Sequence, residues 1–373
     1  MTNRARKAYD RKIGGAFAPI RGAANTAAIV TLSGLLLWLT FRSVNLIATW
    51  QLIEQLGPWC LVAVVPSFIA LFAETWAWQQ TFGLFAGTPP IFRLLQVRVI
   101  SESLGNALPL GPVWSEGIKP RLLAKHCGLD LAASLTGMAA RKYLLLLSQG
   151  FYLLLAFIFG VRTIEHAFSE LGADRLFAQT VLLAALLLVF AAEFIAKSLG
   201  GGRIAQRALS GLCAVPLPGL RAALTRFRDR MVSTDSHAIR FFRAPLLSRW
   251  LLSLQYLGAW LLEAAETWLL LVMVGAPITF SQALAVEAVV VLARHLLFVL
   301  PAGLGAQELG YALFLGTLGV SPEHSAAFVL IKRMKELLWI VVGYLLWVTD
   351  TAATPDAYPA PGLTVPPLAR SRT

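Results

Sequence analysis

The second half of the chain repeats a set of polar and turn-forming residues from the first half. The tetrapeptide Ala73-Glu74-Thr75-Trp76 recurs as Ala265-Glu266-Thr267-Trp268, and further matches follow at the same offset. These matches pair Pro109 with Pro301, Gly111 with Gly303, Glu116 with Glu308, Arg141 with Arg333, and Tyr152 with Tyr344. Matching Glu, Arg, Pro and Gly carries more weight than matching Leu or Val, because these residues are costly or disruptive inside a membrane. The pattern predicts two related structural units, with a chance match in apolar sequence as the alternative.

The composition indicates a membrane protein. Hydrophobic residues make up 57% of the 373 residues, charged residues make up 14%, and the mean hydropathy is +0.68. Such a chain is typical of polytopic membrane proteins rather than soluble ones. The three cysteines, Cys60, Cys127 and Cys213, are far apart and form no CxxC pair. We therefore expect no disulfide, no metal site and no cofactor.

Six apolar segments are long enough to cross about 30 Å of hydrocarbon as helices. They are residues 26–48, 58–82, 131–159, 176–199, 246–274 and 322–348. Basic residues precede the first segment, and no clear cleavage site follows it. Residues 1–25 are therefore predicted to be a basic cytoplasmic tail before an uncleaved anchor.

Two further apolar segments, 91–125 and 280–318, are interrupted in the middle. The interruptions read Pro109-Leu110-Gly111-Pro112 and Pro301-Ala302-Gly303-Leu304-Gly305. Proline removes a hydrogen-bond donor and glycine loosens the backbone, so each segment is expected to form two half-helices around a turn. We interpret both as re-entrant hairpins that enter and leave on one side. A kinked crossing pair is the alternative that hydropathy leaves open.

Basic residues set the predicted orientation. The loop 200–245 is rich in Arg, whereas the opposite side receives the acidic residues of 165–174. This pattern places both termini in the cytoplasm. It predicts an all-α membrane domain, 26–349, of six transmembrane helices and two re-entrant hairpins, followed by a disordered Pro-rich tail at 350–373. The units 58–159 and 246–348 then form an inverted repeat, an architecture typical of transporters with a site near the midplane.

The formal charge of +12 does not require a nucleic-acid partner. Arginines of the loop 200–245 are expected to face anionic lipid headgroups at the cytoplasmic surface. The sequence leaves the oligomeric state open.

Several charged residues lie deep within the predicted spans, where a lone charge costs at least about 2.5 to 3.5 kcal/mol. One interpretation is that they form ion pairs that only fix the helix packing. The other is that they line a cavity in which a guanidinium binds a phosphate or carboxylate and a glutamate titrates. The candidate substrate-binding residues are Arg141, Lys142, Arg333, Lys335, Glu336, Glu116, Glu308, Glu74, Glu266 and Asn106.

The turns of the hairpins add to the second interpretation. Helices that begin after Gly111 and after Gly305 would direct free backbone N–H groups into the membrane interior, where they favour an anion. Glu116 and Glu308 are predicted in the first turns of these helices, where capping of their own amides is the alternative role. No catalytic set of residues was found.

The runs 98–123 (RVISESLGNALPLGPVWSEGIKPRLL) and 296–347, which begins LLFVLPAGLGAQELGYALF, resemble the membrane region of lysylphosphatidylglycerol synthases. They also resemble the stand-alone flippase-like proteins built from that region. The resemblance spans about 26–348 and implies movement of lipids between leaflets, with hopanoid or polyprenyl lipid pathways as the context of some stand-alone members. The residues that the resemblance implies are functional are Asn106, Pro109, Glu116, Pro301, Gly303, Gly305, Glu308 and Arg333.

The synthases also carry a soluble aminoacyl-transfer domain, which this sequence does not show, so lipid lysylation by this chain alone is not expected. The sequence therefore predicts a lipid translocase of the bacterial inner membrane, moving a hopanoid, a polyprenyl phosphate or a phospholipid. No ATP-binding motif is present, so transport would be passive or ion-coupled. The alternatives are a membrane-embedded subunit of a lipid-modifying enzyme and a scaffold that recruits lipid-biosynthesis enzymes through the loop 200–245.

Overall fold

The computed structural model describes residues 23–108, 110–172, 176–200, 236–297, 300 and 303–352. Within these ranges the regular structure is entirely helical. The labelled helices, with their first and last residues, are α2 (Ala23–Phe41), α3 (Leu46–Leu56), η2 (Gly57–Ala63), α4 (Val64–Gly83), α5 (Ile91–Ala107), α6 (Gly111–Cys127), α7 (Leu131–Glu170), α8 (Leu176–Gly200), α11 (Leu246–Met273), α12 (Phe280–Leu296), α13 (Ala306–Thr317) and α14 (Pro322–Ala352). The predicted basic tail up to residue 22, most of the loop 200–245 and the Pro-rich tail from 353 lie outside the described residues.

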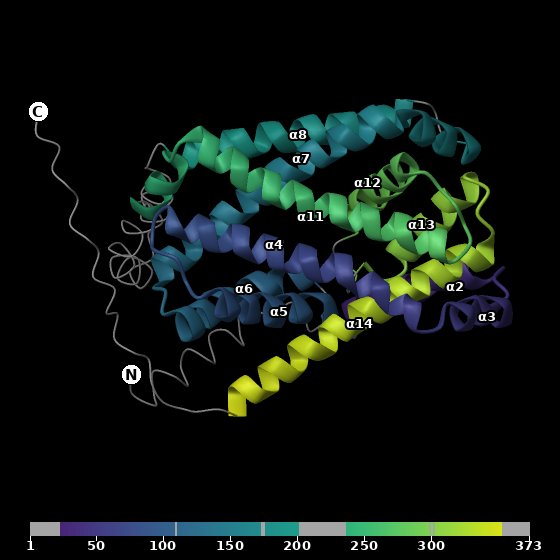
Figure 1. Cartoon of the computed structure of the whole chain (residues 1–373), viewed down its shortest axis with the longest axis horizontal. Coiled ribbons are helices and arrows are strands. Elements are labelled where there is room, and N and C mark those ends of the chain that lie inside the picture. The colour runs from purple at the N-terminus through teal and green to yellow at the C-terminus, as the bar shows by residue number, and fades with distance from the viewer. Residues whose placement is uncertain are drawn as a thin grey trace, which may run out of the picture.

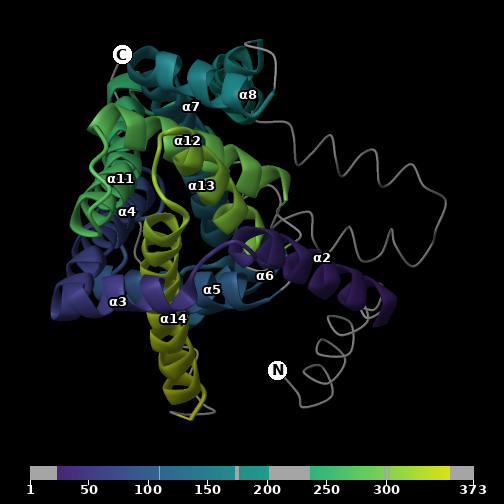
Figure 2. The same cartoon turned by 90° about the vertical axis from the view of Figure 1, so that its right-hand side faces the viewer.

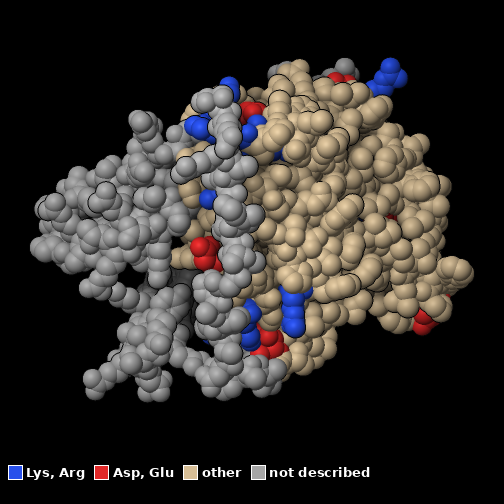
Figure 3. All heavy atoms as spheres, turned by 60° about the vertical axis from the view of Figure 1, so that its left-hand side comes forward, with Lys and Arg blue, Asp and Glu red and all other residues tan. Residues whose placement is uncertain are grey.

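Within the described residues, four helical stretches are apolar and long enough to cross a membrane. They are Leu46–Gly83, Leu131–Glu170, Gln179–Lys197 and Leu246–Met273. The outward face of α8 shows why these helices need a lipid solvent. Leu183, Leu187, Phe190 and Phe194 recur at helical spacing and are each more than half exposed. Most of the described surface visible in Figure 3 likewise carries no charged side chain, as expected of a protein embedded in a bilayer.

The first predicted span, 26–48, is wrong in its bounds. Helix α2 ends at Phe41, and a separate helix α3 begins at Leu46. The cause is Asn45, whose side chain accepts hydrogen bonds from the backbone N–H groups of Ile47 and Ala48, each at 3.1 Å. This N-cap starts a new helix inside a run that hydropathy alone treats as continuous.

Two other predicted spans differ from the observed helices. The segment 58–82 begins as the 3-10 helix η2, and α-helical geometry starts only at Val64. The segment 131–159 continues as α7 to Glu170, a helix of 40 residues. Hydropathy locates the apolar part of a helix, whereas α7 continues through polar residues that need no hydrocarbon around them.

Each interrupted segment forms two helices, as predicted. Helices α5 and α6 are separated by residues 108–110, where Leu110 adopts the left-handed φ of 56°. The two arms touch directly, because a Cβ atom on Gly111 would overlap the carbonyl oxygen of Gly105. Helices α12 and α13 are separated by a turn that contains Gly303 and Gly305, whose φ values are 63° and 87°. The predicted turn residues Pro109 and Pro301 lie outside the described residues.

Both outer ends of the α5–α6 pair lie at one end of the molecule, toward the left of Figure 1. There Trp78 Nε1 of α4 donates to the Gly137 carbonyl of α7 at 3.0 Å, and Phe85 stacks edge-on against Phe241. The end of α14 is also there, because Lys125 Nζ lies 2.8 Å from Asp350 Oδ2.

The α12–α13 pair lies toward the other end of the molecule, at the right of Figure 1. Trp268 Nε1 of α11 donates to the Ile278 carbonyl just before α12, at 3.0 Å. Gly275 in the same connection faces the side chain of His324 in the first turn of α14.

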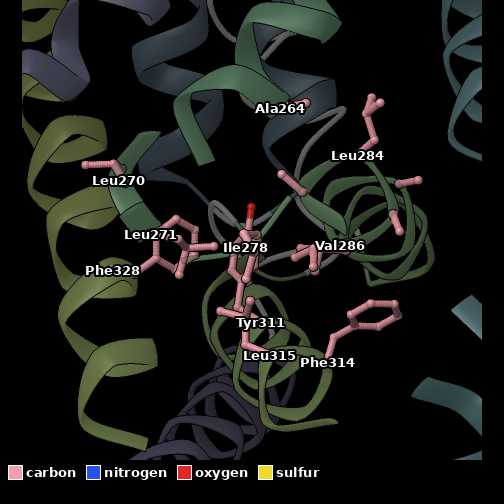
Figure 4. Packing of buried hydrophobic residues seen from close by; sticks show 14 of the residues in the cluster. Ala264, Leu270, Leu271, Ile278, Leu284, Val286, Tyr311, Phe314, Leu315 and Phe328 are labelled. Carbon is pink, nitrogen blue, oxygen red and sulfur yellow. The ribbon is translucent and has the colours of Figure 1, made fainter. Parts of the chain in front are cut away.

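The helices pack in a crossed pattern. Helix α4 packs against α11, α5 against α14, and α12 against α7. Figure 2 shows α7 and α8 on one side of this core and α14 projecting on the other. One core cluster includes Leu271, Tyr311, Phe314 and Phe328, which converge between α11, α12, α13 and α14 in Figure 4. These contacts hold the two hairpins between long helices.

Candidate functional site

A first cluster of charged side chains joins α4, α5 and α7. Arg98 of α5 contacts Glu74 Oε2 through Nη2 at 2.6 Å and Glu102 Oε1 through Nε at 2.8 Å. Arg141 Nη2 of α7 contacts the same two carboxylates, at 3.4 Å from Glu74 and 2.9 Å from Glu102. Both arginines are buried, and Arg141 also lies over the Trp78 ring. Two cations thus hold two carboxylates in one closed network.

Glu116 of α6 forms a second group beside this cluster. Its Oε1 lies 2.8 Å from Lys119 Nζ and 2.9 Å from Lys142 Nζ of α7. The predicted place of Glu116 in the first turn is wrong, because α6 begins at Gly111 and carries no acidic residue in its first turn, so the alternative capping role does not apply to it. Glu116 lies one turn later, where its carboxylate binds two lysines instead of backbone amides.

A buried network joins α11, α12, α13 and α14. Lys332 Nζ forms an ion pair with Glu287 and donates to Thr267 Oγ1 at 2.7 Å and to Tyr311 Oη at 2.9 Å. Tyr311 in turn donates to Glu287, 2.8 Å from Oε1. Glu287 is 2% exposed and Lys332 is 7% exposed, so both charges depend on each other for neutralisation.

Arg333 connects α13 and α14 next to this network. Its Nε lies 2.6 Å from Glu308 Oε1, and its Nη1 pairs with Glu336. The other oxygen of Glu308 accepts the backbone N–H of Gly305 at 2.7 Å. Glu308 therefore has the alternative, capping role, and the same carboxylate also binds a cation. Arg333 thus connects Glu308, which caps the helix after the hairpin turn, to Glu336 one helical turn further along α14.

Lys335 pairs with Glu266 of α11, which is 1% exposed. This contact faces a cavity of about 210 Å³ between α4, α5, α11 and α14. Its polar and charged lining residues are Ser67, Glu74, Arg98, Glu102, Ser103, Asn106, Glu263, Glu266, Lys335 and Glu336. Arg141 and Arg333 do not line the cavity themselves; each contacts a glutamate that does.

The structure brings the predicted residues together in these two regions. Glu74 and Arg141 belong to the first cluster with Arg98, Glu116 and Lys142 lie beside it, and Glu308 and Arg333 meet at the second hairpin. Asn106 is exposed at the end of α5 and lines the cavity.

Residues of the networks and of the cavity lining that were not among the predicted site residues include Arg98, Lys119, Glu263, Glu287, Tyr311 and Lys332. The repeat did not mark Arg98 or Glu287, because Val290 and Leu95 occupy the matching positions. A signal for Glu287 was present in the sequence, since it is a lone carboxylate in an apolar helix. A carboxylate in a membrane helix is a candidate functional residue because burying its charge in hydrocarbon costs free energy.

No group of three or more His, Cys, Asp or Glu side chains in the described residues has the arrangement to hold a metal ion. Cys60 and Cys127 are free thiols. The chemistry of the site rests on carboxylates, guanidinium and ammonium groups, which bind ions and polar headgroups by charge.

The sequence of this chain matches the model of one protein family. The family is described as "Lysylphosphatidylglycerol synthase TM region", and the match covers residues 26–343. No curated protein and no solved structure matches the chain.

Proposed function

Since this chain belongs to the lysylphosphatidylglycerol synthase transmembrane-region family, we propose that it is a lipid translocase. It moves an amphipathic lipid between the leaflets of the bacterial inner membrane, with both of its termini in the cytoplasm. The lipid is a hopanoid, a polyprenyl phosphate or a phospholipid, as the resemblance to stand-alone members implies.

The proposed architecture is an inverted repeat of six membrane helices and two re-entrant hairpins. The crossed packing supports it, because α5 packs on α14 in the way that its counterpart α12 packs on α7. The positions of the hairpins support it as well, since α5–α6 and α12–α13 lie toward opposite ends of the molecule (Figure 1). Transporters of this construction bind substrate between their repeats.

The cavity is the observation that carries the proposal. It has a volume of about 210 Å³, is lined by charged residues, and lies among helices whose outer surfaces are apolar. A polar headgroup crosses a bilayer only with compensation for its lost hydration. Charged side chains in a cavity between the units provide this compensation while the acyl chains remain in lipid.

The buried arginines are the proposed anion-binding groups. Arg141 Nε is buried and has no hydrogen-bond partner in the described structure. A phosphate oxygen that displaces Glu102 or Glu74 from Arg141 would meet a donor geometry suited to bidentate binding. Arg333 occupies the matching position in the second unit, where Glu308 and Glu336 hold it.

Leaflet exchange in proteoliposomes tests this function. Purified protein is reconstituted with fluorescent phospholipid, and the label accessible to a membrane-impermeant quencher is followed over time. We expect Glu308→Gln and Arg333→Ala to slow exchange by about tenfold or more, since each removes a buried charge-assisted contact. Glu165→Gln is the matched control, because Glu165 is exposed on α7 and does not line the cavity.

A variant that leaves every ion pair intact separates blocked transport from misfolding. Asn106 is exposed and lines the cavity, so Asn106→Trp should obstruct it without disturbing a buried charge. Unchanged exchange in Asn106→Trp, Glu308→Gln and Arg333→Ala would remove the proposed site. Chromatography of the recovered lipid tests the alternative that the protein is part of a lipid-modifying enzyme, because that alternative predicts a chemically altered lipid.

A further inference from the structure

The cavity between α4, α5, α11 and α14 meets the outer surface of the molecule at a pair of stacked aromatic rings. Trp339 of α14 lines the cavity, and Phe68 of α4 stacks on it with ring centroids 6.3 Å apart and ring planes 11° from parallel. Phe68 is 51% exposed and follows Ser67, which also lines the cavity. One ring of the pair therefore borders the charged interior and the other borders the surroundings. We name Phe68 and Trp339 the aromatic rim.

The surface outside the aromatic rim is apolar on both helices. Val65 and Phe72 lie one turn before and one turn after Phe68 on α4, and both are exposed. Leu338 of α14, next to Trp339, is exposed as well. The change from a charged cavity lining to an apolar outer surface is thus made across the two rings of the rim.

The other sides of the cavity are closed by direct bonds or by close packing. Ser103 Oγ of α5 donates to the Ile340 carbonyl of α14 at 2.8 Å. Arg98 Nη1 of α5 donates to the Leu71 carbonyl of α4 at 2.9 Å. Lys335 joins α14 to α11 through its ion pair, and α4 packs along α11. Opening any of these sides breaks a hydrogen bond, an ion pair or an extensive contact between helices.

The side between α4 and α14 is held differently. Helix α14 packs closely on α5 and α3, whereas α4 and α14 approach each other closely at few positions. The aromatic rim bridges the two helices there, and stacked rings separate without the loss of a hydrogen bond or an ion pair. This side can therefore open toward the bilayer while the charged networks stay intact.

A lipid with its headgroup in the cavity needs such an opening. Its hydrocarbon chains gain nothing from a charged lining and remain in the bilayer, so the junction between headgroup and chain has to cross the wall of the cavity. An indole combines an apolar ring with an N–H donor, which suits Trp339 to a junction that is polar on one side and apolar on the other. Phe68 offers an apolar ring face on the side of the chain.

We propose that the aromatic rim is a lipid-binding site, at which Phe68 and Trp339 hold the junction between the headgroup and the hydrocarbon chain of a membrane lipid. The headgroup enters the cavity sideways from the bilayer, between α4 and α14. This inference rests on the proposed translocase function and identifies where its substrate enters. A water-soluble solute that reaches the cavity from an end of the molecule is the alternative that the experiments exclude or support.

A reversible bridge across the rim tests the route. In a background without Cys60, Cys127 and Cys213, Phe68→Cys and Trp339→Cys are joined by a bifunctional methanethiosulfonate, and leaflet exchange of a fluorescent phospholipid is measured. We expect the bridge to slow exchange by about tenfold or more, because it fixes the wall that has to open, and reduction of the bridge to restore the rate.

The control is a second stacked pair, Phe190 and Phe194, which is exposed on α8 and does not line the cavity. Bridging Phe190→Cys to Phe194→Cys should leave exchange unchanged. Equal exchange before and after complete bridging of positions 68 and 339 would overturn the route between α4 and α14.

Photolabelling tests binding at the rim without a transport assay. The protein is placed in nanodiscs with a phospholipid that carries a diazirine on its acyl chain next to the ester, and labelled peptides are quantified by mass spectrometry. The readout is the labelling around Phe68 and Trp339 divided by the labelling around Phe190 and Phe194, which reports bulk lipid. We expect Asn106→Trp, which fills the cavity, to lower this ratio about threefold or more, because a lipid with an excluded headgroup no longer prefers the rim.

The ratio also separates this inference from the function on which it rests. The same ratio in the wild type and in Asn106→Trp would show that only bulk lipid lies at the rim, and it would overturn the binding site. Absence of leaflet exchange in the wild type would contradict the translocase function instead, and the ratio would still decide whether the rim binds lipid.

Discussion

At the scale of single residues, the buried charges differ in how much they depend on their partners. Lys332 and Glu287 are both buried, and Thr267 and Tyr311 accept hydrogen bonds from Lys332 and donate hydrogen bonds to Glu287. Lys125, by contrast, is 39% exposed beside Asp350. Removing one member of a buried pair strands the other charge, but removing an exposed partner leaves water to replace it.

We expect Lys332→Met to lower the free energy of unfolding by about 3 to 5 kcal/mol, because Glu287 is then buried without a cation. Lys125→Ala is the control and should cost less than about 1 kcal/mol. The measurement is thermal or denaturant unfolding in detergent micelles. The double variant Lys332→Met with Glu287→Leu should recover most of the loss, since Leu is the residue at the matching position 95. A single variant as stable as Lys125→Ala would contradict the dependence of Glu287 on Lys332.

At the same scale, the sequence predicts charged residues better than it predicts their partners. The repeat marks charged residues without assigning them to pairs, and in the structure Arg141 contacts Glu74. Glu266 binds Lys335, and Arg333 binds Glu308 and Glu336. Side chains one position apart on α14 point about 100° apart around the helix, so the choice of partner depends on helix rotation. The sequence does not contain that rotation.

At the scale of elements, the hairpins depend on close contact between their arms. Gly105 and Gly111 meet where a Cβ on Gly111 would overlap the Gly105 carbonyl oxygen. Gly117, further along the same helix, has no atom within 4 Å of its would-be Cβ. Gly111 and Gly117 of α6 are therefore suited to a comparison of the same substitution at a crowded and an open position.

We expect Gly111→Ala to destabilise the first hairpin by roughly 1 to 3 kcal/mol, as typical for an overpacked contact. Gly117→Ala should be neutral or slightly stabilising, because alanine is the better helix former. Hydrogen exchange of α5 and α6 reports the hairpin directly, and faster exchange confined to Gly111→Ala is the expected result. Equal protection in both variants would show that the arms separate without cost.

The broken segments were predicted from proline and glycine, and the helices on either side are found as expected. The bounds of the first two spans were wrong, because Asn45 caps α3 and because η2 precedes α4. Capping acts through one side chain and two amides, which leaves no mark on a hydropathy profile.

At the scale of the whole molecule, the arrangement of the helices defines two ends. The end of α4, the start of α7 and the end of α14 share one of them, as the contacts of Trp78 and Asp350 indicate. The end of α7 and the start of α14 are at the other. The proposed topology assigns the first end to the cytoplasm.

Thiol labelling of intact cells tests this assignment. In a background without Cys60, Cys127 and Cys213, a single cysteine is placed at Arg243 or at Glu170, both of which are exposed. A membrane-impermeant maleimide should label the cysteine at 170 in intact cells and the one at 243 only after permeabilisation. Labelling of both from the outside would refute the proposed topology.

The fold class and the membrane location could be predicted because apolar length and composition determine them. The cavity could not, because its lining comes from α4, α5, α11 and α14 at sequence positions far apart. The packing of α4 on α11 and of α5 on α14 brings Glu263 and Arg98 to the same cavity. The sequence pattern of a single helix does not predict which residues of other helices lie close to it.

The network that joins Arg98 and Arg141 to Glu74 and Glu102 has a mechanical consequence. Each arginine contacts both carboxylates, and the four side chains come from three helices. A small displacement of α5 would weaken several of these contacts at once, before any new partner is within reach. The molecule should therefore occupy a few discrete conformations and switch between them cooperatively instead of bending gradually.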